Sequence, residues 1–358
     1  MRACVAALAA LLTVVILWDA FQTIVLARRV SRKFRLTRVF YRVLWTPWRA
    51  VAIRIPPGDR RENVLMVFGP MSLILLSAAW ALGLVASFAL LQWGLGSHVV
   101  GADGQSGFGV DLYMSGTTFF TLGLGDVTPQ TSAARAVTVT ECGMGFAFLA
   151  LVIGYVPLIS QAFSRREASI SMLDARAGSP PTAGELLRRN ARAGDDALRE
   201  LLRDWERWAA ELLESHISFP LLSYFRSQHD AQSWVAALTA ILDVCALAVA
   251  RMDDAPAATA RLTFAMARHA VADLCAVLHL APAAPPADRL PPAEARRLER
   301  VLADAGVGLR TDETSMARFT GLRAAYEPYV HALSVFLVMP LPGLVSADQP
   351  RDGWHTMA

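Results

Sequence analysis

Residues 117–130 read TTFFTLGLGDVTPQ, and the interpretation of the whole chain depends on this stretch. Gly123 and Gly125 are separated by one bulky residue, Leu124, and are followed at once by the carboxylate of Asp126. Glycines at this spacing occur in hairpin turns, in phosphate loops and in ion filters, because each of these needs backbone that a Cβ would oppose. The sequence on either side of the stretch distinguishes these three possibilities.

The composition indicates a membrane protein. The 358 residues are 54% hydrophobic and only 18% charged, with a mean hydropathy of +0.37, which is too apolar for an ordinary soluble chain. Three apolar segments reach the length of about 20 residues that a helix needs to cross a bilayer. They cover residues 3–27, which include Asp19, residues 64–95, and residues 136–163, which include Glu141.

The charge distribution predicts the topology. Residues 28–62 contain eleven arginines and lysines but only two acidic residues, so we expect this segment to be cytoplasmic. The N-terminus is then outside, residues 96–135 face the exterior, and the expected location is the inner (cell) membrane with several spans. A cleaved signal peptide is the alternative for residues 3–27, although the basic residues that follow would oppose their own translocation.

Aromatic and basic residues alternate in the segment 28–62. Arginines among anionic lipid head groups, with aromatic rings in the interface, are typical of an amphipathic helix on the inner membrane surface. The aromatic residues concerned are Phe34, Phe40, Trp45 and Trp48. A nucleic-acid patch is the alternative, and two flanking membrane spans argue against it.

The glycine stretch follows residues 112–120, an apolar and hydroxyl-rich run too short to cross the membrane. We expect a short helix that enters the membrane and returns, and non-helical backbone at that depth must face protein or water. In an ion filter, carbonyl oxygens replace the hydration shell of a cation, and positive φ at alternate residues lets successive carbonyls face one axis. Gly123 and Gly125 satisfy this need, and Thr121 can add a hydroxyl oxygen.

Residues 121–126, TLGLGD, resemble the signature of the potassium-channel pore family: threonine, a small aliphatic residue, glycine, an aromatic residue, glycine and aspartate. The resemblance covers roughly residues 64–168, with further matches at Tyr113, Ser115, Pro129, Arg135 and Gly145. It implies that K⁺ is the transported ion and that no cofactor is needed. It also implies an ion-binding filter of Thr121, Leu122, Gly123, Leu124 and Gly125.

Two residues depart from the family pattern. Leu124 replaces the aromatic residue of the filter, so its side chain must hold the filter by packing alone, although some animal two-pore channels have the same leucine. Thr117 stands where many members have a glutamate that bonds to the filter aspartate. Glu141 is a candidate to replace that carboxylate, and a structural role such as pairing with Arg135 is the alternative. The residues expected to support the filter are Asp126, Glu141, Thr117 and Tyr113.

The third apolar segment carries the features of a pore-lining helix. Phe146, Leu149 and Ile153 recur every three or four positions after Gly145, the position of the family's hinge glycine. We expect these apolar residues to line a cavity that closes by dewetting, with Gly154 and Pro157 as places to bend. Packing on neighbouring helices is the alternative.

A carbonyl cage needs four strands around an axis, and this chain supplies one. The expected assembly is therefore a homotetramer that works as a potassium-selective channel. Two alternatives remain open: a non-selective cation channel, and a non-conducting membrane receptor or scaffold with a vestigial pore.

Residues 164–358 have the pattern of a helical domain rich in alanine, leucine and arginine. Helices are expected near residues 229–251, 256–281, 292–306 and 312–339, with a proline-rich loop between the second and third. This half contains no nucleotide-binding or hydrolase motif, so we expect no enzyme. The predicted fold is an all-α membrane protein with three transmembrane helices, a re-entrant pore helix and filter at 112–129, a pore domain over 1–163 and a cytosolic helical domain over 164–358.

Overall fold

A computed structural model describes residues 1–26, 36–96, 98–101, 104–229, 231–252 and 256–346. Within these ranges the chain is almost wholly helical and divides into two compact units, Met1–Ser160 and Gln161–Ala358. The division falls inside one continuous helix, α5 (Ser132–Ala177), where the sequence suggested a boundary after residue 163. The helix continues because no glycine or proline follows Pro157 until Gly178, which has a positive φ of 77°.

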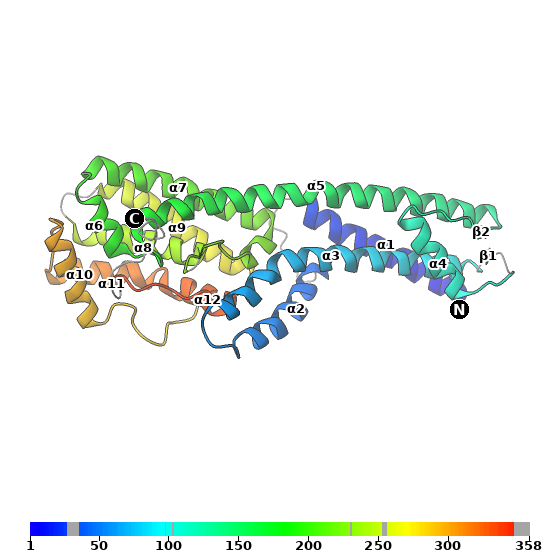
Figure 1. Ribbon diagram of the computed structural model, residues 1–358, viewed down its shortest axis with the longest axis horizontal. Coiled ribbons are helices and arrows are strands. Elements are labelled where there is room, and N and C mark those ends of the chain that lie inside the picture. The colour runs from blue at the N-terminus through cyan, green and yellow to red at the C-terminus, as the bar shows by residue number, and fades with distance from the viewer. Residues whose placement is uncertain (27–35, 97, 102–103, 230, 253–255, 347–358) are drawn as a thin grey trace. The chain divides into compact units, whose positions relative to one another are not determined.

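In the first unit, α1 (Arg2–Ile24) and α3 (Asp59–Gly94) lie side by side (Figure 1). Their contact is close, because a Cβ on Gly94 would lie 2.7 Å from the backbone nitrogen of Ala6. The hydroxyl oxygens of Thr13 and Ser87 are 2.8 Å apart in the same interface. Small residues therefore let these two apolar helices approach each other, as in many membrane helix pairs.

Asp19 joins three helices of this unit. Its carboxylate accepts hydrogen bonds from Thr37 Oγ1 of α2 (Leu36–Ala52) at 2.6 Å and from Trp80 Nε1 of α3 at 3.1 Å. The carboxylate is buried within α1, at 5% exposure. Asp19 thus has a structural position, in which each donor offsets part of the cost of its burial.

Helix α2 packs on α3 through two of its aromatic side chains. Trp45 is buried with its ring centroid 4.7 Å from that of Phe68 in α3, and Trp48 Nε1 donates to the carbonyl of Val64 at 3.0 Å. These indoles pack on α3 because burial of a large ring, with its N–H hydrogen-bonded, stabilises the fold more than leaving the ring in water. Phe34 and the first basic residues of the segment lie outside the described residues.

Two short strands that the sequence did not predict flank α4 (Phe108–Phe119) and the filter. Strand β1 (Val99–Gly101) pairs antiparallel with β2 (Val127–Pro129), with Val99 opposite Pro129. The segment that leads into α4 is therefore hydrogen-bonded to the segment that follows residues 121–126. Strands of three residues give too little alternation to be recognised in a sequence.

The second unit surrounds one apolar helix, α8 (Trp234–Arg251), in which every residue is buried. Four described helices are long and apolar enough to cross a membrane by length and composition: α1, α3, α5 and α8. Burial of α8 among other helices explains its composition without a membrane. The remaining helices are α6 (Ala183–Asn190), α7 (Asp195–Ser218), η1 (Pro220–Tyr224), α9 (Ala257–Val277), α10 (Pro292–Asp304), α11 (Glu313–Ala324) and α12 (Glu327–Leu337).

The last predicted helix, over 312–339, is two helices in the structure. Helix α11 ends at Ala324, and Pro328 lies in the first turn of α12. Proline has no N–H and its ring clashes with the carbonyl four residues earlier, which is Ala324. The helix therefore breaks before Pro328.

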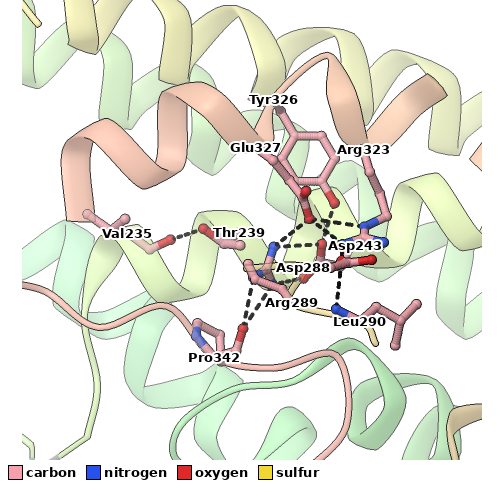
Figure 2. A network of polar contacts seen from close by, with 10 residues as sticks. All are labelled: Val235, Thr239, Asp243, Asp288, Arg289, Leu290, Arg323, Tyr326, Glu327 and Pro342. Carbon is pink, nitrogen blue, oxygen red and sulfur yellow. Dashed lines mark hydrogen bonds and ion pairs between the residues drawn. The ribbon is translucent and has the colours of Figure 1, made fainter. Parts of the chain in front are cut away.

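A buried polar network ties α8 to the loop before α10 and to α11 and α12 (Figure 2). Arg289 Nη2 donates to Asp243 Oδ2 at 2.5 Å and to the carbonyl of Pro342 at 2.9 Å, and Tyr326 donates to Asp243. Arg323 bonds to Glu327 at 2.8 Å. The Asp243 carboxylate is fully buried and has both a cation and a hydroxyl as partners.

Candidate ion filter

The backbone after α4 has the alternation that a carbonyl filter requires. Thr121, Gly123 and Gly125 have positive φ values of 58°, 54° and 78°. Positive φ costs a residue with a Cβ about 1–2 kcal/mol, and Thr121 is the member of the set that is not glycine. Every second residue of the segment 121–125 is therefore left-handed, which the glycine spacing predicted for Gly123 and Gly125 but not for Thr121.

The pore helix holds the start of this segment through its own backbone. The N–H groups of Leu122 and Gly123 both point to the carbonyl of Thr117, at 2.8 and 3.4 Å. Thr117 Oγ1 donates instead to the carbonyl of Met114, at 3.0 Å. Thr117 therefore holds residues 122 and 123 through its main-chain carbonyl.

On the outer side of the filter, Tyr113 Oη donates to Asp126 Oδ2 at 2.8 Å. This bond joins α4 to the residue that follows the last filter glycine. Tyr113 thus bonds to Asp126, the aspartate that a pore-helix glutamate contacts in many members of the potassium-channel pore family, which this segment resembles. Both side chains are exposed within one chain.

The filter is open on one side in a single chain. Residues 120–126 are exposed, and the side chains of Leu122 and Leu124 are each 63% exposed. The packing expected to hold Leu124 is therefore not supplied by its own pore helix. Leu124 differs in this respect from Phe119, which is buried.

Helix α5 contacts the pore helix through two residues one turn apart, Glu141 and Gly145. Ser115 Oγ is hydrogen-bonded to Glu141 Oε1, and a Cβ on Gly145 would lie 2.1 Å from the carbonyl oxygen of Phe119. Ser115 and Phe119 are also four residues apart, so one face of α5 meets one face of α4. Close approach to α4, as well as any hinge role, thus requires glycine at position 145.

Arg135 bonds to a backbone carbonyl and not to Glu141. Its Nε donates to the carbonyl of Pro129 at 3.2 Å, at the end of β2. The alternative role for Glu141, pairing with Arg135, therefore differs from the bonds that the structure gives these residues. Glu141 is only 2% exposed and bonds to a hydroxyl.

The expected pore-lining residues lie on one exposed face of α5. Phe146, Leu149 and Ile153 are 68%, 52% and 65% exposed within the single chain. Gly154 and Pro157 both lie inside the continuous helix. Large apolar side chains exposed in a row need lipid, a partner or a dewetted cavity around them.

Two contacts of the site were not predicted from the sequence. Ser115 Oγ lies 2.7 Å from the carbonyl of Val85 in α3, and Gln92 Nε2 donates to the carbonyl of Ala134 in α5 at 3.1 Å. A glutamine inside an apolar helix was the available signal for the second contact. Among the described residues, no group of three histidine, cysteine or acidic side chains could hold a metal ion.

Comparison with known proteins gives one match. Residues 73–157 match a family described as ion channel, a range that includes most of α3, all of α4, the filter and the apolar part of α5. No curated protein and no solved structure matches the chain. The match indicates that this segment is an ion-channel pore in a membrane protein.

Proposed function

We propose that four copies of this chain form a channel that passes K⁺ through backbone carbonyls of residues 121–125. One observation carries the proposal, the left-handed backbone at Thr121, Gly123 and Gly125 directly after a short helix. Successive carbonyls of such a segment can face one axis and replace the hydration shell of a cation. The partial negative charge at the C-terminus of α4 also favours a cation there.

Four chains together would cover the filter segment and the apolar face of α5 that one chain leaves exposed. The filter residues and the row Phe146, Leu149 and Ile153 are exposed in a single chain. A closed fourfold arrangement puts the filter segments around one axis and gives the apolar row a shared cavity to line. The homotetramer is therefore the assembly that this arrangement favours.

The proposed placement in the inner membrane follows the charge distribution. Helices α1, α3 and the first part of α5 span the bilayer, the N-terminus is outside, and the second unit is cytoplasmic. The basic segment 28–62 contacts anionic lipid head groups. Lipids and further copies of the chain are the proposed partners, and no nucleic acid, cofactor or enzymatic activity is proposed.

A non-selective cation channel is the second candidate, and exposed Leu124 is the observation that favours it. Leucine offers only undirected van der Waals contact, worth about 0.1–0.2 kcal/mol per atom pair. A receptor or scaffold with a vestigial pore is the third, and it differs from both channels in showing no conductance.

The proposal is tested with purified protein in liposomes that hold a potassium gradient. We expect wild-type flux and its loss in Gly123→Ala, because alanine opposes the positive φ at this position although its Cβ would meet nothing within 4 Å. Gly104→Ala is the matched control, with a φ of 79° outside the filter. A wild-type tetramer without flux supports the scaffold, and normal flux in Gly123→Ala contradicts the filter assignment.

A further inference from the structure

Three helices of the membrane unit meet at one buried hydroxyl group. Ser115 of α4 bonds to Glu141 of α5, and Ser115 Oγ also lies 2.7 Å from the carbonyl oxygen of Val85 in α3. Ser115 and Glu141 are 1% and 2% exposed. The three groups form a continuous polar chain through an otherwise apolar helix contact.

Whether Glu141 carries a proton determines how many of the contacts among Glu141, Ser115 and the Val85 carbonyl are hydrogen bonds. A serine hydroxyl has one proton, and the Val85 carbonyl can only accept. If Glu141 is ionised, Ser115 can donate to the carboxylate or to the carbonyl, and one contact is left with two acceptors facing each other. If Glu141 carries a proton, it donates to Ser115, Ser115 donates to Val85, and both contacts are hydrogen bonds.

Among the described residues, the structure pairs no charged side chain with Glu141. On α5, Arg135 bonds to the Pro129 carbonyl, and α3 carries no charged residue between positions 63 and 95. Among the described residues between 96 and 144, the other titratable groups are His98 before β1, Asp111 and Tyr113 on α4, Asp126 after the filter and Cys142 on α5. Further along α5 come Tyr155 and the charged residues from Arg165 onward. An ionised carboxylate buried with one hydroxyl as its partner is costly.

We propose that Glu141 is a positioning residue which holds the pore helix in its conducting position only while it carries a proton. Ser115 lies two residues before Thr117, whose carbonyl accepts the first N–H groups of the filter. Removing the proton breaks one link of α4, either to α3 or to α5, and so releases the support of the filter. Alkaline pH therefore lowers conduction, an inference about regulation that rests on the proposed function.

The first test measures potassium flux of the full-length protein in liposomes from about pH 6 to about pH 10, each variant normalised to its own value at the acid end. We expect wild-type flux to fall at least about tenfold, as loss of a buried hydrogen bond allows, and Glu141→Gln to show no such fall. Cys142→Ser, at the exposed neighbouring position, is the matched control and keeps the wild-type profile. A flat wild-type profile, or an unchanged fall in Glu141→Gln, overturns the proposal.

The second test does not depend on conduction. Infrared difference spectra between wild type and Glu141→Gln at neutral pH show the carbonyl stretch of a protonated carboxylic acid if Glu141 holds the proton. Absence of this band overturns the proposal even in a conducting channel. Presence of the band in a protein that never conducts contradicts the proposed function and leaves the proton assignment intact.

Discussion

Glu141 in the first unit and Asp243 in the second unit are both buried carboxylates, but their partners differ in charge. Asp243 receives two bonds from the Arg289 guanidinium and one from Tyr326, whereas Glu141 meets the hydroxyl of Ser115. A cation and further donors make a buried negative charge tolerable, while one hydroxyl does not. The comparison suggests that Asp243 fixes a structure and that Glu141 can respond to its environment.

The charge of the network around Asp243 also affects its members. Nearby carboxylates, Asp243 first among them, raise the pKa of Arg289 against the opposing effect of burial. Arg323 beside Asp288, together with the Leu290 N–H, holds the pKa of that carboxyl below its usual value in spite of desolvation. The charged forms of Arg289 and Asp288 are therefore favoured in the folded second unit.

The largest expected effect follows from removing the buried charge of that network. Asp243→Ala leaves Arg289 buried without its principal partner, which costs about 3–5 kcal/mol. We expect a clear fall in the thermal unfolding midpoint of the second unit, measured by tryptophan fluorescence on the full-length protein. Asp196→Ala removes an ion pair to Arg199 in which Asp196 is 93% exposed, and it should change the midpoint little. Equal effects of the two substitutions would contradict the contrast.

The second prediction concerns the face of α5 that meets the pore helix. Gly145→Ala forces the carbonyl of Phe119 to move, and overpacking of this kind costs about 1–3 kcal/mol. Potassium flux in liposomes should fall about tenfold or more because the end of α4 carries the filter. Gly143→Ala, whose Cβ would meet nothing within 4 Å in the chain, should keep its flux. Wild-type flux in Gly145→Ala would show that the α4–α5 contact does not position the filter.

Helix α5 also contributes to a buried site in the second unit, which gives a pH-dependent prediction. His216 is fully buried, and burial, with the Arg166 charge nearby, lowers its pKa to about 3. Its Nδ1 lies 2.8 Å from the Leu212 carbonyl and its Nε2 lies 3.4 Å from Arg166 Nη1. A neutral ring that donates from Nδ1 and accepts at Nε2 satisfies both contacts.

The sign of this pH dependence follows from proton binding. An unfolded histidine becomes protonated below about pH 6.5, whereas folded His216 stays neutral down to about pH 3. The unfolded state therefore binds more protons in this window, and stability falls as the pH falls, by up to about 1.4 kcal/mol per unit. His216→Gln should flatten this part of the profile in chemical unfolding of the full-length protein. Identical slopes would refute a neutral buried ring.

The smallest effect is expected at the exposed end of the filter. Tyr113→Phe removes the hydrogen bond to Asp126, which water can partly replace because both side chains are exposed. We expect about a twofold loss of flux and a faster decline of current during prolonged conduction, measured in planar bilayers. A tenfold loss would mean that this bond supports the filter more strongly than its exposure indicates.

The sequence was most informative where one residue type meets a local need. Gly123 and Gly125 stand at alternate positions of a short segment, and their left-handed backbone follows from that spacing alone. Apolar length likewise indicated the long apolar helices α1, α3 and α5. The break before Pro328 was missed when one helix was predicted over 312–339, although it has an equally local cause, since proline ends a helix through its own ring.

Contacts between segments could not be obtained in the same way. Glu141 and Gly145 reveal their role only beside Ser115 and Phe119, and their pairing depends on how α5 docks on α4. Trp45 in α2 has an amphipathic setting that fits a lipid interface as well as a protein contact, and the sequence alone does not show that it packs on Phe68. The helical period gives the face of a helix without saying what covers that face.

The most direct test of the central claim is the reversal potential of the wild-type channel between potassium on one side and sodium on the other. A carbonyl filter built on Thr121, Gly123 and Gly125 predicts a potential near that of potassium when potassium is abundant. Because Leu124 offers only undirected van der Waals contact, the preference should weaken as potassium is withdrawn. A reversal potential near zero in abundant potassium would contradict a potassium filter and support the non-selective channel.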